Sequence, residues 1–322
     1  IMIMQEDPNP TPVATWRIGG NFTLSSGTVT AYNARNGDIY FIGGTTQTYL
    51  KTGGSIDNEI NFHVNGGSIL DVGTSLIDGS TGTFTLNSNA GIITAHAQGL
   101  SNTAGIGSIQ VTGLKSFNTG ADYTYDGTAA QVTGNALPGT VRDLTIDNAA
   151  GVTLTSSTTV DRTLDLDDGN LILQANTMTI NSSGTINNAS STSYVVADGS
   201  GTLIQRVLAA DKDFPVGTAG SYLPITLYNI GTADDFGVRV FADVLENGDA
   251  GATIAELAEC VNASWVLSEN IAGGSNLSVT TQWNGTDEGG SFNRISCGIG
   301  HHDGSGWQAQ SATGSAAGTD PY

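Results

Sequence analysis

Basic residues and long apolar runs are both scarce in this sequence. Of its 322 residues, 10 are Lys or Arg and 30 are Asp or Glu, so the formal net charge is −20. Phosphate binding needs clustered basic side chains, which excludes nucleic acid as a partner. No apolar run approaches the roughly 20 residues of a membrane-spanning helix, so we expect no membrane span. The opening IMIM is too short for the apolar region of a signal peptide, so a secreted form of this chain would be the mature one.

Cysteine is almost absent as well. Cys260 and Cys297 are the two cysteines, and neither belongs to a C-x-x-C motif, which argues against zinc. In a secreted, strand-rich domain the pair predicts a disulfide that would contribute roughly 3–4 kcal/mol. The alternative is a pair of buried thiols.

Short alternating segments separated by turns are what the sequence has in abundance. Glycine accounts for 44 residues, and apolar residues recur between turns rich in Gly, Asn and Ser. Alternation of period two indicates strands with one buried and one solvated face. Runs of short strands without intervening helices leave a sandwich, a barrel or a β-solenoid. We favour an irregular β-solenoid (β-helix) over residues 21–206, because the strands are very short and the turns tolerate left-handed backbone at coil corners.

Two further regions flank the solenoid in this reading. Residues 1–20 read as an extended N-terminal arm, in which an apolar tetrad and an acidic stretch precede the stiff PNPTP linker. Residues 207–322 contain longer alternating strands and three of the four tryptophans, which predicts a C-terminal β-sandwich. A short helix is expected within residues 254–260. The whole chain is therefore predicted to be all-β.

Several phrases carry a resemblance to a known group. They are YTYDGTAAQVTGNALPGTVRDLTIDNAAGVTL (123–154), TLDLDDGNLILQANTMTI (163–180), DFPVGTAGSYLPITL (213–227), WNGTDEGGSFNR (283–294) and HHDGSGW (301–307). In these phrases the chain resembles secreted, adhesin-like β-solenoid surface proteins of the Bacteroidota, exported by type IX secretion. The resemblance implies an extracellular structural or adhesive role and specifies no activity. Similar chains usually continue into another strand, so the sandwich is expected to lack an edge strand.

The apolar tetrad at the N-terminus suggests an assembly mechanism. Ile1, Met2, Ile3 and Met4 either return to their own domain or insert into another molecule. An open sheet edge invites an added strand. We therefore expect the tetrad to act as a donor strand in a neighbour's sandwich. Such an exchange does not have to close and can grow a filament of identical subunits.

An aspartate cluster is the first candidate for chemistry. Asp165 and Asp167 alternate with leucines and point outward, and Asp168 opens the following turn. Three carboxylates could hold calcium, but a solvated strand and turn is the favoured reading. A polysaccharide lyase would need basic residues beside such acids, and Arg162 is the one basic residue close in sequence. No calcium requirement is expected.

The histidines form the second candidate. His301, His302 and Asp303 could suggest a metal, but adjacent residues on a strand point to opposite faces, so a structural role is favoured. His63 and His96 lie alone within strand phrases and are expected to be packed or half-exposed. No motif of a hydrolase, metalloprotease or P-loop protein is present.

These observations favour a non-enzymatic protein without cofactors. The leading hypothesis is an extracellular filament subunit whose main partner is itself, with cell-surface or extracellular polysaccharide as a further possible partner. The alternative is a carbohydrate-binding or carbohydrate-cleaving β-helix protein. An outward row of acids, bases and aromatic residues on consecutive coils would favour that alternative.

Overall fold

The computed structural model describes residues 2–4, 14–31 and 36–322. The chain is all-β, with 44% of residues in strands and 2% in helices, and its parallel strands wind into a β-solenoid of about 9 turns. The predicted fold class is thereby confirmed for the solenoid. The chain divides into two compact units, residues 1–172 with 183–188 and residues 173–182 with 189–322. This division falls earlier than the predicted boundary at residue 206.

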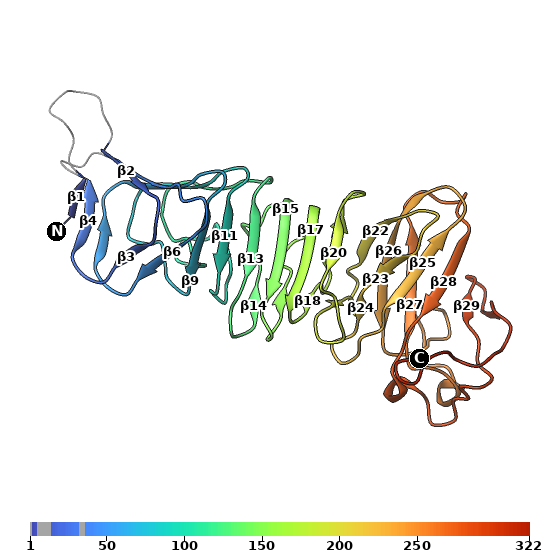
Figure 1. Cartoon of the computed structure of the whole chain (residues 1–322). Coiled ribbons are helices and arrows are strands. Elements are labelled where there is room, and N and C mark those ends of the chain that lie inside the picture. Colours follow the sequence, from blue (N-terminus) through green and yellow to red (C-terminus); the bar gives the residue numbers. More distant parts are fainter. Residues whose placement is uncertain (1, 5–13, 32–35) are drawn as a thin grey trace. The chain divides into compact units, whose positions relative to one another are not determined.

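Parallel sheets form the sides of the first unit (Figure 1). Every pairing in them is parallel, which requires the chain to travel around one coil before it returns to the same side. One sheet contains β2 (Ala14–Ile18), β5 (Gly37–Phe41), β8 (Ile60–Val64), β10 (Phe84–Leu86) and β12 (Lys115–Phe117). A second contains β3 (Phe22–Leu24), β6 (Thr46–Lys51), β9 (Ile69–Gly73), β11 (Gly91–Thr94), β13 (Asp122–Tyr125), β15 (Thr140–Asp147), β17 (Thr158–Asp168) and β20 (Thr185–Asn187). Shorter strands complete the coils: β1 (Met2–Met4), β4 (Thr28–Ala31) and β7 (Ser55–Asp57), then β14 (Gln131–Val132), β16 (Val152–Thr153) and β18 (Leu171–Ile172).

Columns of apolar side chains fill the interior of the coils. Tyr123, Leu144, Leu164 and Ile186 occupy equivalent positions on successive coils. The first three are almost fully buried. From Tyr123 onward the steps are 21, 20 and 22 residues, so one coil corresponds to about three of the seven-residue phrases in the sequence. Stacking in register buries each apolar row against the next coil.

Left-handed residues lie at coil corners, as the composition of the turns predicts. Asn58, Asn89 and Asn188 adopt φ angles of 64°, 59° and 58°. Asparagine tolerates this region better than most residues because its short polar side chain bonds locally.

Antiparallel pairing distinguishes much of the second unit. The strands β22 (Leu203–Val207), β26 (Asp234–Phe241) and β27 (Ser264–Glu269) pair in that order, and β22 also pairs in parallel with β19 (Met178–Ile180). The strands β23 (Lys212–Phe214), β25 (Ile225–Asn229) and β28 (Leu277–Thr281) form another antiparallel sheet. That these sheets form a sandwich stays a prediction. The remaining elements are β21 (Val195–Val196), β24 (Val216–Gly217), the hairpin of β29 (Gly300–His302) and β30 (Trp307–Ala309), and the short 3₁₀ helices η2 (Leu257–Glu259) and η3 (Gly285–Asp287).

The predicted N-terminal arm is partly incorporated into the solenoid. Residues 2–4 form β1, which pairs in parallel with β4, and residues 14–18 form β2, which pairs with β5. The linker from residue 5 to 13 lies outside the described residues. Residues 1–20 are therefore not one separate extended segment.

Candidate interaction surfaces

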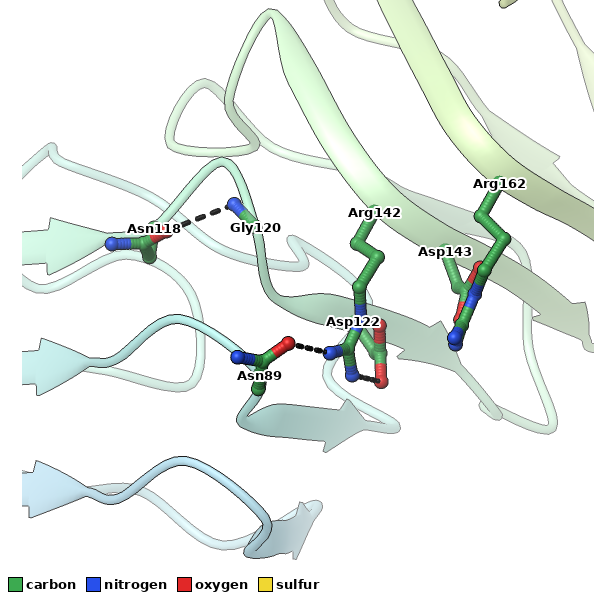
Figure 2. A network of polar contacts seen from close by, with 7 residues as sticks. All are labelled: Asn89, Asn118, Gly120, Asp122, Arg142, Asp143 and Arg162. Carbon is green, nitrogen blue, oxygen red and sulfur yellow. Dashed lines mark hydrogen bonds and ion pairs between the residues drawn. The ribbon is translucent and has the colours of Figure 1, made fainter. Parts of the chain in front are cut away.

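Ion pairs connect consecutive coils on the outward face of the second sheet (Figure 2). The Nε of Arg142 on β15 donates to Oδ1 of Asp122 on β13 at 2.6 Å, and its Nη2 donates to Oδ2 of the same carboxylate. The Nη1 of Arg142 also bonds to Oδ1 of Asn89, one coil further back. All three guanidinium nitrogens are thereby engaged, and a neighbouring turn is closed by Asn118, whose Oδ1 accepts from the amide of Gly120 at 2.8 Å.

A second pair repeats this arrangement one coil later. Arg162 on β17 contacts both carboxylate oxygens of Asp143 through Nε, at 2.9 and 3.1 Å. Burial alone would raise the pKa of the Asp143 carboxyl, but the bonds and charge of Arg162, with the charge of Arg142, leave that pKa below its ordinary value. The side chain of Arg162 is 62% exposed and that of Asp143 is 17% exposed.

Arg162 is the one basic residue close in sequence to the aspartate cluster, but the structure brings a second arginine near it. Arg142 lies one coil away from Arg162, and each arginine binds an aspartate about 20 positions earlier in the sequence. A coil length of about 20 residues was the signal that would have revealed them. The paired acids and bases neutralise each other, so the arrangement supports the register of adjacent coils.

The aspartate cluster is held by an amide group. The Nδ2 of Asn188 donates to Oδ1 of Asp165 and to Oδ1 of Asp167, at 2.7 Å in each case. Asp168 instead lies in register with Asp147 of the preceding coil. Burial, and then the charge of Asp167, raises the pKa of Asp165. Asp167 and Asp168 are exposed, as a solvated strand and turn would place them.

No metal-ligating group emerges within the part of the chain that the structure describes. No set of three or more His, Cys, Asp or Glu side chains in residues 2–4, 14–31 and 36–322 is arranged to hold a metal ion. His301 is exposed, whereas His302 packs edge to face against Trp307, with ring centroids 5.5 Å apart. The Oδ1 of Asp303 accepts bonds from Ser305 within the turn. The two histidines thus do not converge on one point.

The other two histidines lie on the solenoid. His96 is half-buried, its Nδ1 accepts from the amide of Gln98 at 3.1 Å, and burial lowers its pKa. His63 on β8 is half-buried on an outward face. Both match the expectation of packed or half-exposed side chains.

The predicted disulfide is not formed in this structure. Cys260 and Cys297 are free thiols, and both are half-buried. The Sγ of Cys260 points to the carbonyl oxygen of Glu256, and the Sγ of Cys297 points to the carbonyl oxygens of Arg294 and Gly314, all at 3.6 Å. Each thiol is therefore directed to its own local backbone. Burial, followed by two nearby glutamates, raises the pKa of the Cys260 thiol.

The N-terminal strand returns to its own chain in this structure. Met2, Ile3 and Met4 lie in register with Val29, Thr30 and Ala31 of β4, and Ile1 lies outside the described residues. This is the first of the two options that the sequence left open. Among the described strands, β1 lies at the edge of its sheet.

An open sheet edge lies in the second unit. Among the described strands, β27 pairs on one side, with β26, and ends its sheet. Trp265 and Leu267 of β27 lie opposite Val240 and Val238 of β26, which are fully buried, yet both are themselves half-exposed. In the same row, Oε1 of Glu269 is buried without a hydrogen-bond partner. The strand β28 also ends its sheet among the described strands.

Comparisons with known proteins add no relative. No protein-family model, curated protein or solved structure matches the chain. A search of the described residues for a helix long and apolar enough to cross a bilayer found none.

Proposed function

We propose that this chain is an extracellular, non-enzymatic structural or adhesive protein that assembles with copies of itself. In this proposal Met2–Met4 leave β4, and residues Ile1–Met4 add a strand beside β27 of a neighbouring subunit. Secretion by a member of the Bacteroidota through the type IX system belongs to the same proposal and rests on the sequence resemblance. A β-solenoid is compatible with surface and adhesin-like roles.

The observation that carries the proposal is the edge of β27. Its backbone donors and acceptors face no strand on one side among the described residues, and its inward apolar side chains are half-exposed. An extended segment with alternating apolar residues satisfies both needs at once, through main-chain hydrogen bonds and through burial.

The donor segment is suited to exchange. It is held to β4 by the pairing of three residues, and the nine residues from 5 to 13 could span about 30 Å when extended. Insertion of four residues that buries about 300 Å² of apolar surface corresponds to about 7 kcal/mol before ordering costs. Donor and acceptor are different surfaces, so the contact is heterologous and can propagate into a filament.

A peptide competition experiment tests the proposal without altering the chain. A synthetic peptide of residues 1–7 is added in excess to purified protein, and polymer formation is followed by light scattering and negative-stain microscopy. The peptide should occupy β27 and suppress filaments, whereas the same peptide with Ile3→Asp should not. Deletion of residues 1–7 should give the same loss, and Leu267→Asp should remove the acceptor.

End-to-end stacking of coils is the rival mechanism. Filaments that persist after the deletion and in the presence of the peptide would remove strand exchange and leave stacking. Thermal unfolding of each variant checks that the solenoid has remained folded.

The carbohydrate-cleaving alternative gains little from the ion pairs. Asp122 and Asp143 lie beside Arg142 and Arg162 on consecutive coils, which is the kind of row that this alternative requires. However, a carboxyl whose pKa is lowered, as that of Asp143 is, stays ionised near neutral pH and is a poor general acid. The row is better suited to structure than to catalysis.

A further inference from the structure

The outward face of the sheet that contains β2, β5 and β8 bears a second polar arrangement. The inward residues of β5 and β8, such as Ile39, Phe41 and Phe62, are fully buried. Their neighbours in sequence therefore face outward. Arg17, Tyr40 and His63 lie in register on three consecutive coils, and we call them, with Asp38 and Asn61 of the parallel row, the N-terminal patch.

The side chains of the N-terminal patch hold one another in place. The guanidinium of Arg17 lies 5.2 Å from the centroid of the Tyr40 ring. The rings of Tyr40 and His63 stack with centroids 4.4 Å apart and an interplanar angle of 12°. Each step of the stack is one coil, so the solenoid spacing sets the stacking distance.

Hydrogen bonds fix the second row against the first. The Oδ1 of Asp38 accepts from Nδ2 of Asn61 at 2.9 Å and pairs with Nε2 of His63 at 3.3 Å. The Oδ1 of Asn61 accepts from the amide and the hydroxyl of Thr83, at 2.9 and 3.1 Å, which directs its Nδ2 toward Asp38. The imidazole and the carboxylate are thus oriented before any ligand arrives.

The polar tips remain accessible. Arg17 is exposed, Tyr40 is half-buried, and the side chains of His63 and Asp38 are 20% and 18% exposed. Pre-oriented groups lose little conformational entropy on binding, which favours affinity. This arrangement differs from the ion pairs of Figure 2, where all three guanidinium nitrogens of Arg142 are bonded to oxygen atoms.

The chemistry of the patch points to hydroxyl-rich ligands. It offers a cationic donor, a phenol, an imidazole and a carboxylate, a mixture that suits hydroxyl groups because these both donate and accept. A net charge of −20 repels polyanions. Arg17 and His63 cover the two faces of the Tyr40 ring, so a ligand would meet the polar edges of the stack. Neighbouring strands of a sheet lie about 4.8 Å apart, so the patch repeats its polar side chains at that spacing along an open surface. Such a surface suits an extended polymer better than a small enclosed molecule.

We propose that the N-terminal patch, formed by Arg17, Asp38, Tyr40, Asn61 and His63, binds a neutral, extended polysaccharide. This inference rests on the adhesive half of the proposed function and names its surface and ligand class. It does not depend on strand exchange, because the patch is complete within one chain.

Affinity electrophoresis tests the assignment with defined probes. The full chain is run in native gels that contain xylan, laminarin or dextran, and in a gel that contains alginate as an anionic comparator. We expect retardation in at least one neutral gel and none in alginate. Tyr40→Phe removes the phenol and keeps the stack, and Asp38→Asn removes the charge; together they should weaken retardation at least tenfold. Tyr228→Phe on β25, also half-exposed, is the matched control and should change nothing.

Each contrary outcome identifies what has failed. No retardation in any neutral gel, or equal retardation by the double variant and the wild type, would overturn the assignment of the patch. Retardation in alginate alone would overturn the neutral ligand class. Wild-type protein that forms filaments but is not retarded in any neutral gel would remove this inference and leave self-assembly standing, whereas wild-type protein that is retarded but forms no filaments would do the reverse.

Discussion

The solenoid and the C-terminal unit bury their apolar rows to different extents. In the solenoid, Leu144 and Leu164 are fully buried because each coil covers the row of the coil before it. In the second unit, Val238 is fully buried but its neighbour Leu267 on β27 is half-exposed. In the middle of the solenoid each coil is covered on both sides, whereas β27 pairs on one side among the described strands. In the proposed assembly, this open strand is the one that accepts a neighbour.

The ion pairs of the two regions differ in the sequence separation of the paired residues. In the solenoid, Arg142 and Arg162 bind aspartates 20 and 19 positions away, because one coil separates them. In the second unit, Arg239 and Arg294 bind acids 10 and 6 positions away. Both solenoid pairs therefore join consecutive coils, whereas in the second unit these two pairs are local and a third, Arg206 with Asp235, spans 29 positions.

The largest expected effect comes from a glycine at a solenoid corner. Gly169 has a φ of +75°, and an added Cβ would lie 1.9 Å from the carbonyl oxygen of Asn148 on the preceding coil. Gly169→Ala should lower the free energy of unfolding by about 4 kcal/mol, from backbone strain and overpacking together. Gly304 in the C-terminal hairpin has a φ of +91°, but nothing lies within 4 Å of an added Cβ. Gly304→Ala should therefore lower the free energy of unfolding by about 1–3 kcal/mol, from backbone strain alone. Urea unfolding measures both variants, and equal losses of unfolding free energy would contradict the difference between the two sites.

Truncation of a core side chain should separate the two units by a comparable amount. Leu164→Ala opens a cavity in a fully buried column and should cost about 2–5 kcal/mol. Leu277→Ala on β28 removes a half-exposed side chain and should cost about 1 kcal/mol. Circular dichroism during denaturation measures both. A costlier change at Leu277 would mean that β28 is covered in solution.

Acid should reveal the ion pairs of the solenoid. The pKa of Asp143 is lowered in the folded chain, so its contribution to stability is present above the ordinary carboxyl pKa and is lost as pH falls below about 4. Arg162→Ala should cost up to about 1 kcal/mol at pH 7 and less at pH 2.5. Arg206→Ala breaks a longer pair, 3.4 Å, with Asp235, whose side chain is more exposed than that of Asp143; it serves as the control and should cost less. A loss for Arg162→Ala that is the same at both pH values would contradict the assignment.

The smallest effect is expected from calcium. Asp165 and Asp167 already share the amide of Asn188, and no ligand loop repeats along the coils. A chelator should therefore leave the melting temperature within about 1 °C. A fall of many degrees would show that the aspartate cluster holds a structural ion.

The alternation of apolar and polar residues along short strands allowed the fold to be predicted from the sequence. The phrase INFHV places Ile60, Phe62 and Val64 inward and His63 outward, as the structure has them. Contacts between coils were harder to read, because the step between equivalent residues varies: Ile92 to Tyr123 spans 31 positions, whereas Leu144 to Leu164 spans 20. The pairing of Arg142 with Asp122 and the stacking of Tyr40 on His63 depend on that register. Composition alone also suggested a disulfide, although the Cys260 and Cys297 side chains point to separate backbone carbonyls.

Hydrogen–deuterium exchange on the polymerising protein tests the central claim most directly. Amides of β27 are followed in the wild type before and after assembly, with the chain lacking residues 1–7 as reference. The account predicts that β27 gains protection on assembly in the wild type and not in the truncated chain, because an added strand bonds to its open edge. Unchanged exchange in β27, with new protection confined to β2 and β3, would contradict strand donation and favour end-to-end stacking of solenoids.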